Sequence, residues 1–281
     1  MPELPEVEIT ARLLGEAVSG AEVESAQVTG ISTLKSFDPP LAAVAGRQIQ
    51  GMGRRGKHLI VDFEGDIVLL IHLMSAGRFQ LFGKRGSIRD KTSRLLIRLT
   101  DGRELRLREF GTRQSCWAKL LHSQALAAEP AVATLGPEAW PDPPPFGPLL
   151  KYPRPLNSLL RDQKVIAGIG RSWADEILHR AKLSPFKRGD DLTADEAELL
   201  REATVDILGI AIKHYTKVLK VPIPDKFPLP LTVHHHIDEP CPRCGAPIQA
   251  VHFEDYDMCY CPTCQTGGRS LKDRRLSRLL K

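Results

Sequence analysis

The sequence predicts an α+β protein with three folded parts, and three observations support this fold class. Apolar residues follow helical spacing over residues 3–18, and strand-like runs follow from about residue 20 to residue 118. The hydrophobic period becomes helical again after a proline-rich segment at residues 137–155. Two Cys-x-x-Cys pairs then lie between Cys241 and Cys264. We therefore expect an N-terminal helix on a β-sandwich or barrel, a helical domain and a small cysteine module.

The composition is that of an ordinary globular protein. The chain has 281 residues, 42% hydrophobic and 26% charged, and apolar runs such as Ile67–Ile71 are too short to cross a bilayer. Acidic residues stand where a signal peptide needs basic and apolar segments, so we expect a cytoplasmic protein with no membrane partner. The net charge of +5 weakly favours polyanions, and the basic residues gather at 54–57, at 94–108 and in the tail from Arg269 to Lys281.

The β-rich part is predicted from alternating apolar residues. The strand-like runs cover residues 58–63, 67–73, 77–82, 93–99 and 103–110. Asp101 and Gly102 stand between the last two runs and are typical of a two-residue hairpin turn.

The middle of the chain is predicted to be helical. The segment DQKVIAGIGRSWADEILHRA suggests a helix from Asp162, a turn at Gly168 and Gly170, and a second helix. A third helix is expected after Thr193, which is a suitable N-cap with Glu196 as its capping-box partner.

The cysteine module predicts one structural Zn²⁺ ion. Its two knuckles, CPRC and CPTC, are separated by sixteen residues, and four thiolates at such spacing suit a tetrahedral zinc. Matched knuckles argue against a redox role, and the strand-like run between them suggests a zinc-held β-hairpin. We expect Cys259 to pack beside the site, and His234–His236 to enter the finger as a strand or loop without binding metal. The predicted ligands are Cys241, Cys244, Cys261 and Cys264.

The N-terminal stretch MPELPEVE has two interpretations. Removal of Met1 would leave Pro2 as a secondary amine beside Glu3, and an α-amino group with a pKa of about 8 is a competent nucleophile toward an aldehyde-like carbon. The resulting iminium would allow elimination of a β-phosphate. Alternatively, Pro2 and Pro5 only start a helix, which residue types alone favour.

Five stretches occur together and in order: MPELPEVE, RRGKHL, LGPE, DQKVIAGIG and the cysteine finger. This ordered set resembles the formamidopyrimidine-DNA glycosylase / endonuclease VIII family along nearly the whole chain. The resemblance implies an N-terminal helix on a β-sandwich, a helix–two-turn–helix domain and a C-terminal zinc-finger β-hairpin. The expected parts are residues 1–134, 135–225 and 231–266, followed by a basic tail at 267–281.

The resemblance also implies an activity. The family removes oxidised bases from DNA and then nicks the strand, so the chain is expected to be a bifunctional DNA glycosylase and AP lyase of base-excision repair. By motif, Pro2 would attack the sugar C1′, Glu3 would assist ring opening, Glu6 would support the site and Lys57 would contact phosphate. The expected partner is damaged or abasic DNA, bound by a monomer.

A base-excision enzyme must flip its target and fill the space left in the duplex. In glycosylases of the formamidopyrimidine type a Met, an Arg and a Phe do so, and Arg108 and Phe110 match the last two. Met74 is the third only if HLMSAG is shifted by one residue, since otherwise Ser75 takes that place. Glu109 replaces a second arginine.

Two departures from the family concern the phosphate grip. The asparagine expected after the glycine turn is Arg171, and the finger arginine aligns with Tyr256, so we expect β-elimination with weak or absent δ-elimination. The short segment VPIPDKFPLP replaces the lesion-capping loop. These changes leave two alternatives open, a DNA-binding protein that has lost base excision and a glycosylase for bulky or crosslinked lesions. In the tail, Leu271, Leu276 and Leu279 form a partial helical stripe that would dock on the protein or follow phosphates.

Overall fold

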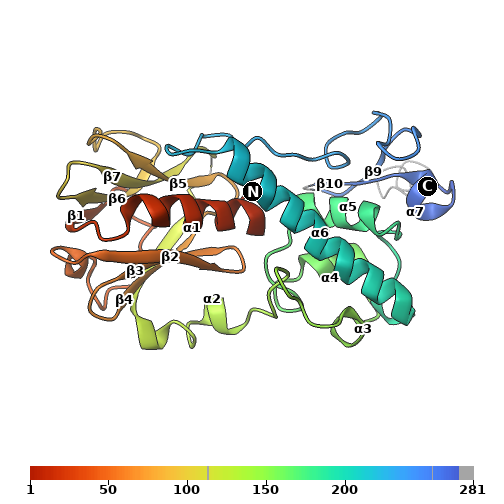
Figure 1. Ribbon diagram of the computed structural model, residues 1–281, viewed down its shortest axis with the longest axis horizontal. Coiled ribbons are helices and arrows are strands. Elements are labelled where there is room, and N and C mark those ends of the chain that lie inside the picture. Colours follow the sequence, from red (N-terminus) through yellow and green to blue (C-terminus); the bar gives the residue numbers. More distant parts are fainter. Residues whose placement is uncertain (113, 255, 272–281) are drawn as a thin grey trace. The chain divides into compact units, whose positions relative to one another are not determined.

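The computed structural model describes residues 1–112, 114–254 and 256–271, and the chain forms two compact units (Figure 1). The first unit combines Met1–Thr134 with Ile212–Pro228, and the second combines Leu135–Ala211 with the chain from Leu229 onward. The basic tail beyond Leu271, with Leu276 and Leu279, lies outside the described residues. Among the described residues, no helix is both long and apolar enough to span a membrane.

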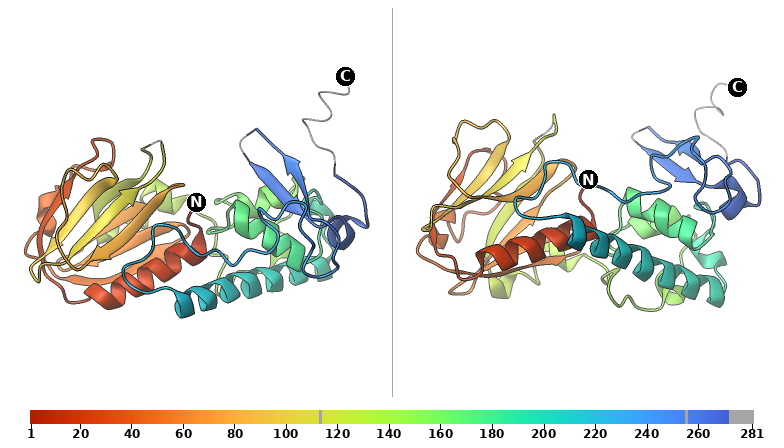
Figure 2. Two further views of the ribbon diagram at one scale, coloured as in Figure 1. Left: turned by 90° about the horizontal axis from the view of Figure 1, so that it is seen from above. Right: turned by 45° about the horizontal axis from the view of Figure 1, so that its top comes forward.

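The predicted N-terminal helix is confirmed as α1 (Leu4–Val18), which lies alongside the strands of the first unit (Figure 1 and Figure 2). Glu3 is its N-cap and forms a capping box with Glu6, in which the Glu3 backbone N–H donates to Glu6 Oε2 at 2.8 Å. Its apolar stripe is fully buried, and α1 packs on strands β2 and β3. Burial of this stripe fixes the capped end, and therefore the N-terminus, against the sheets.

The strands of the first unit form two four-stranded antiparallel sheets, so the sandwich prediction is confirmed. One sheet has the order β1-β6-β7-β5 and the other β2-β3-β4-β8. Apolar side chains from both sheets form the core between them. The bounds are β1 (Val23–Val28), β2 (Ile49–Arg55), β3 (His58–Phe63), β4 (Ile67–His72), β5 (Gly77–Phe82), β6 (Ser93–Leu99), β7 (Glu104–Glu109) and β8 (Trp117–His122), with short helices η1 (Leu41–Val44), η2 (Ser123–Ala125) and α2 (Pro130–Ala133) between or after them.

The β6–β7 hairpin is confirmed, but the prediction of a two-residue turn is wrong. The Leu99 N–H donates to the Arg103 carbonyl and the Gly102 N–H donates to the Leu99 carbonyl, which encloses three residues, 100–102. Gly102 has φ +88°, and the Asp101 side chain accepts the Arg103 N–H at 3.0 Å. The aspartate thus closes a local side-chain turn that a two-residue loop would not need.

The second unit contains α3 (Phe146–Leu149), α4 (Leu156–Arg161), α5 (Arg171–Arg180), η3 (Gly189–Asp191) and the first part of α6 (Ala194–Val218). The predicted capping box of α6 is confirmed, because Thr193 and Glu196 exchange backbone-to-side-chain hydrogen bonds. The prediction of a helix starting at Asp162 is wrong, because α4 ends at Arg161. The Asp162 side chain accepts the Lys164 N–H, and Gln163 bonds three backbone groups of residues 161–169, so local side-chain bonds replace helical ones.

The cysteine module is a β-hairpin of β9 (Gln249–His252) and β10 (Asp257–Tyr260), followed by helix α7 (Pro262–Thr266). The predicted hairpin between the two knuckles is therefore confirmed. The histidines at 234–236 lie in a loop before this hairpin, as expected.

Candidate active site and metal centre

Two buried carboxylates lie at the start of α1. Glu3 is 1% exposed and Glu6 is 2% exposed. Glu6 accepts the Glu3 N–H through Oε2, and its Oε1 accepts the hydroxyl of Tyr215 at 2.6 Å. Burial, followed by the charge of Glu6, raises the pKa of Tyr215, which therefore remains a donor. Glu6 thus connects the N-terminus to the end of α6 in the same unit.

The amino group of Met1 lies close to these carboxylates and to two cations. Burial lowers its pKa from 8.0, Glu3 and Glu6 oppose this shift, and Arg78 and Lys57 add to it. These four charged side chains include Glu3, Glu6 and Lys57, which are all the predicted catalytic side chains. The structure therefore brings the three together beside the backbone of Pro2.

Lys57 lies in the tight turn between β2 and β3 and is only 7% exposed. Gly56 in this turn has φ +55°, a conformation that glycine adopts without strain. Arg54 ties the turn to α1, because its Nε donates to Glu8 Oε2 at 2.7 Å. The ion pair fixes Lys57 relative to the helix that carries Glu3 and Glu6.

Arg78 and Tyr215 are site residues that sequence reasoning missed. The Arg78 guanidinium lies 5.1 Å from the centre of the Phe227 ring, and Nη1 donates to the Gly77 carbonyl at 2.6 Å. Its Nε is buried and has no hydrogen-bond partner among the described residues. Burial lowers the pKa of Arg78. No sequence motif marks either residue, because Arg78 lies in an ordinary strand and Tyr215 lies in the last turn of an ordinary helix.

The three residues predicted to fill the vacated duplex lie at one end of the β5–β7 pair. Met74 lies in the turn before β5 with φ +49°, and its N–H donates to His72 Nδ1 at 3.0 Å. Phe110 donates its N–H to the Ala76 carbonyl of the same turn and is 40% exposed. The Arg108 guanidinium lies 4.7 Å from the Phe110 ring centre. Met74 is half-buried in this turn and Ser75 is exposed.

Arg108 is held by the segment that replaces the expected lesion-capping loop. Its Nη1 donates to Asp225 Oδ1 at 2.9 Å and its Nε to Thr92 Oγ1 at 3.0 Å. Gln80 Nε2 donates to the Ile223 carbonyl at 2.6 Å and to Asp225 Oδ1 at 2.9 Å. Residues 223–225 are therefore fastened to β5 and β7.

Glu109, where the family pattern has a second arginine, has a structural role. It is 2% exposed and accepts the N–H groups of Ser115 and Cys116 at 2.8 and 3.0 Å, together with Arg94 Nε at 3.3 Å. Burial alone would raise its pKa, but the hydrogen bonds lower it overall. Glu109 therefore anchors the chain that follows Phe110.

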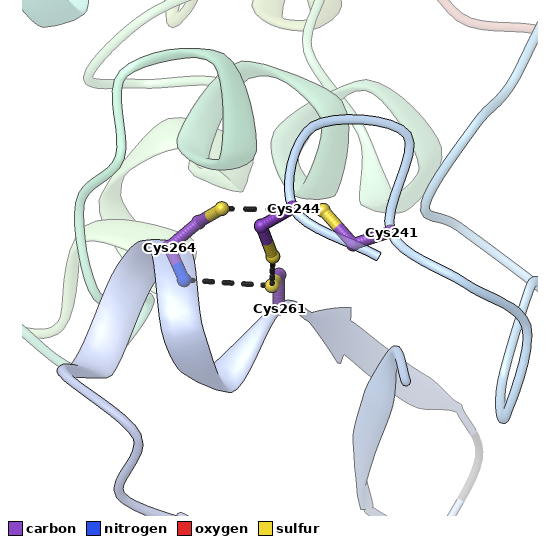
Figure 3. A group of neighbouring side chains, drawn as sticks. All are labelled: Cys241, Cys244, Cys261 and Cys264. Carbon is purple, nitrogen blue, oxygen red and sulfur yellow. Dashed lines mark hydrogen bonds between the residues drawn. The ribbon is translucent and has the colours of Figure 1, made fainter. Parts of the chain in front are cut away.

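The four predicted zinc ligands converge between the two knuckles (Figure 3). All four sulfurs lie within 4.8 Å of one another, with Cys244 Sγ 3.5 Å from Cys261 Sγ and Cys241 Sγ 4.0 Å from Cys264 Sγ. Zinc–sulfur bonds of about 2.3 Å in a tetrahedron require sulfur separations of about 3.8 Å. The cysteines therefore fit one structural zinc ion, which would hold the β-hairpin and α7 together.

Helix α5 supports this metal centre. His179 Nε2 lies 3.2 Å from Cys241 Sγ, and Arg243 Nη1 donates to the His179 carbonyl at 2.9 Å. Gln265 bridges the second knuckle, because its Oε1 accepts the Cys261 N–H and its Nε2 donates to the Leu183 carbonyl. Such outer contacts orient thiolate ligands.

Two buried carboxylates of α5 hold the segment that enters the finger, and no sequence motif indicates them. Glu176 accepts the backbone N–H groups of residues 232–234 at 2.8 to 3.0 Å. Asp175 Oδ2 accepts from His234 Nδ1 at 2.7 Å and from the Cys259 N–H at 2.9 Å. Cys259 is buried outside the zinc set, and burial raises its pKa to about 12. It packs beside the site, as expected.

Arg171 and Tyr256, the two altered phosphate-grip positions, lie together in the second unit. The Arg171 guanidinium carbon is 4.3 Å from the Tyr256 ring centre. The guanidinium carbon of a second cation, Arg161, lies 4.2 Å from the same ring centre. The Phe253 ring stacks on Tyr256 with centroids 4.6 Å apart, beside a cavity of about 440 Å³. Arg161 was not predicted, because it ends a helix without any motif.

A helix on a β-sandwich, a helical domain and a four-cysteine finger define a class of multidomain zinc proteins, and family models identify all three parts. The formamidopyrimidine-DNA glycosylase N-terminal domain matches residues 1–113, and the H2TH domain of the same glycosylase matches residues 146–221. The zinc finger found in FPG and IleRS matches residues 238–267.

Relatives agree over nearly the full length. A formamidopyrimidine-DNA glycosylase of Desulforamulus reducens is 31% identical, with 94% of this chain and 99% of the relative aligned. The Lactococcus lactis Fpg in complex with DNA containing N7-benzyl-Fapy-dG is 28% identical, with 94% of this chain and 100% of that chain covered and a TM-score of 0.84. The same enzyme bound to abasic-site DNA gives a TM-score of 0.84 at 27% identity, with 94% and 99% covered. The chain therefore belongs to the formamidopyrimidine-DNA glycosylase family.

Proposed function

We propose that this chain is a bifunctional DNA glycosylase of base-excision repair with AP-lyase activity. The observation that carries the proposal is the position of the N-terminus, which lies beside the buried carboxylates Glu3 and Glu6 and the cations Lys57 and Arg78. Its full-length relatives are named for glycosylase activity, and the aligned solved structures contain damaged or abasic DNA, which supports DNA of this kind as the substrate.

The proposed reaction starts once Met1 is removed and Pro2 carries the terminal amine. The amine nitrogen bonds to the sugar C1′ while the bond from C1′ to the base breaks, and the base leaves with a proton. Glu3 protonates the sugar ring oxygen, which opens the ring and leaves an iminium. Loss of a C2′ proton then expels the 3′ phosphate, and water releases the sugar remnant and restores the amine. Lys57 contacts the phosphate during this elimination, and Glu6 keeps the helix start in place.

We assign the remaining roles to parts of the chain by their place in the sequence. Residues 1–134 form the catalytic part, residues 135–225 the helix–two-turn–helix part, and residues 231–266 the zinc finger, whose metal is structural. The protein acts as a monomer. The proposed DNA contacts are Met74, Arg108 and Phe110 in the first unit, and Arg171 and Tyr256 in the second.

Covalent trapping tests the proposal. The zinc-loaded protein is incubated with abasic-site DNA and borohydride, and its N-terminus is characterised by mass spectrometry. We expect a reduced adduct on a Met-free Pro2 terminus, a large loss of adduct in Pro2→Gly, and an unchanged yield in the matched control Pro5→Ala. The absence of an adduct from correctly processed protein would instead favour a damage-specific DNA-binding protein, an alternative motivated by the altered residues Arg171 and Tyr256.

The elimination products test the phosphate grip. Because Tyr256 carries no charge where the family pattern has the finger arginine, we expect β-elimination products with little or no δ-elimination. Gel analysis of nicked abasic DNA distinguishes the two. Clean conversion to a one-nucleotide gap with phosphates at both ends would contradict this expectation.

The substrate is proposed to include bulky lesions as well as oxidised bases. The segment that replaces a lesion-capping loop is short, and hydrogen bonds hold its residues 223–225 against Gln80 and Arg108. Held in this way, the segment would not cover a flipped base. Comparison of excision rates for Fapy lesions with and without a bulky N7 substituent tests this. A strong preference for the small lesion would contradict it.

A further inference from the structure

We propose that Arg161 and Arg171 form a two-arginine site for a DNA phosphodiester, with Tyr256 as the residue that positions both guanidinium groups. The inference deepens the proposed function and rests on it, since the ligand is a phosphate of the bound DNA. Arg161 is the new residue in this site. The two guanidinium carbons lie 4.2 and 4.3 Å from one ring centre, so their separation cannot exceed the sum of these distances.

The two guanidinium carbons lie within 8.5 Å of each other, and two positive charges at such a separation attract a negative charge placed beside both. Attraction between a guanidinium and the face of a tyrosine ring contributes about 0.5–1 kcal/mol per pair at partly exposed sites and keeps the side chains extended over the ring. Each guanidinium also offers a fork of N–H donors that matches two phosphate oxygens. The stack therefore keeps two sets of N–H donors close to one side chain, which suits a phosphate diester that contacts both guanidinium groups.

Neighbouring side chains fix the geometry of the stack. Arg161 Nη1 donates to Asn157 Oδ1 at 3.0 Å, and Asn157 Nδ2 reaches the buried Asp175 Oδ1 at 3.4 Å. Phe253 lies nearly parallel to the Tyr256 ring, at an angle of 8°. The three members come from the end of α4, the start of α5 and the β9–β10 hairpin, all within one compact unit.

The Arg161 guanidinium also has N–H donors that are not used in the described contacts. It is half-buried, and over the described ranges its guanidinium makes the single hydrogen bond to Asn157 and no ion pair with a carboxylate. Arg54 and Arg94, in contrast, do have carboxylate partners. A half-buried cation without a carboxylate, held against a second cation, is suited to an external anion.

The experiment measures the salt dependence of DNA binding. Full-length, zinc-loaded protein is titrated against a duplex containing a tetrahydrofuran abasic-site analogue, by fluorescence anisotropy between 50 and 200 mM salt. Loss of one phosphate contact changes the slope of log K against log salt by about 0.9. For Arg161→Gln we expect this reduction, together with an affinity loss of about ten-fold or more at low salt. The matched control is Arg201→Gln, at a half-buried arginine that pairs with Glu198 on α6, and it should change neither quantity.

Variants of Tyr256 separate positioning from charge. Tyr256→Phe retains the ring and should bind like the wild type, whereas Tyr256→Leu should lose affinity while its salt slope stays closer to the wild-type value. Should Arg161→Gln fail to retain one zinc per chain, Arg161→Lys replaces it. This variant keeps the charge, so its slope should be unchanged while its affinity falls because the fork is lost.

An Arg161→Gln variant with normal zinc content, wild-type affinity and wild-type slope would overturn the inference and leave the proposed function standing. An Arg161→Lys variant with wild-type affinity would also show that the paired N–H donors of the guanidinium do not contact the phosphate. If the wild-type protein itself neither binds nor traps the abasic duplex, the proposed function fails and the phosphate site fails with it.

Discussion

The amine cluster of the first unit and the arginine–tyrosine stack of the second unit are built in opposite ways. Apart from Arg78 of β5, the amine cluster gathers residues from one short N-terminal motif and one turn, and its two carboxylates are almost completely buried. The stack gathers single residues from three separate segments, and its members are only half-buried. Both place charged groups for contact with DNA in our proposal, yet only the first follows the family pattern.

The difference shows where a site tolerates substitution. Glu6 satisfies a backbone N–H and the Tyr215 hydroxyl inside the fold, so its replacement would leave two buried donors without an acceptor. At the stack, solvent remains close, and a guanidinium on a neighbouring element can supply the charge that Tyr256 lacks. We therefore expect the proposed phosphate site to tolerate changes of residue better than the buried carboxylates do.

Zinc removal should give the largest effect and should separate the two regions. Structural zinc in small finger modules contributes roughly 10–16 kcal/mol to folding. In Cys264→Ser, or in strong chelator, we expect the finger to unfold and DNA affinity to fall more than about 100-fold, while the sandwich keeps its hydrogen-exchange protection. The control Cys259→Ser removes a buried thiol outside the zinc set and should keep one zinc per chain. Protection lost equally in the sandwich would contradict this independence.

Glu3→Gln should disable the first region and spare the second. Loss of a positioned general acid costs about 10² to 10⁴ in rate. We expect this drop in single-turnover excision and nicking, with duplex affinity within about two-fold of the wild type. Glu16→Gln, at an exposed position on the same helix, is the control. A comparable loss of binding by Glu3→Gln would mean that the two regions are not separable.

Acid should weaken the first unit through two buried histidines. Burial lowers the pKa of His58 to about 4 and that of His72 to about 3, from 6.5. Because the folded pKa values are depressed, both side chains favour the folded state above pH 6.5, and this advantage is lost as pH falls toward 4 and 3. At pH 5 the loss is about 2 kcal/mol for each histidine. Denaturant midpoints at pH 7 and pH 5 measure it. His58→Phe should flatten the dependence, whereas the exposed-site control His122→Gln should leave it intact.

The smallest effect concerns Arg78, and it sharpens the electrostatic description of the amine. Its guanidinium lowers the pKa of the Met1 amino group, and we expect the same charge to act on the Pro2 amine once Met1 is removed. Arg78→Gln should therefore raise the pKa of the Pro2 amine and move the pH profile of borohydride trapping to higher pH. Arg85→Gln, on an exposed arginine that pairs with Glu24, provides the comparison. A profile that does not move, or that moves to lower pH, would show that Arg78 does not act on the amine.

Local rules in the sequence predicted α1, the strands, the α6 capping box and the zinc ligands. Helical and strand periods reflect burial of one face, and two Cys-x-x-Cys knuckles determine a metal site through short-range geometry. The same rules failed at Asp162, where side-chain hydrogen bonds to the backbone ended the helix, and at Asp101, where they lengthened the turn.

The tertiary structure alone decided which distant side chains complete the sites. Tyr215 meets Glu6 across more than two hundred residues, Arg78 reaches the amine from an ordinary strand, and Arg161 meets Tyr256 only because α4 packs near the hairpin. Charge and hydrogen-bond partners depend on distance in space, and no periodic or motif signal records it. The sequence therefore determined the parts of the fold and the proposed position of the nucleophile, and the fold determined the groups that surround that position.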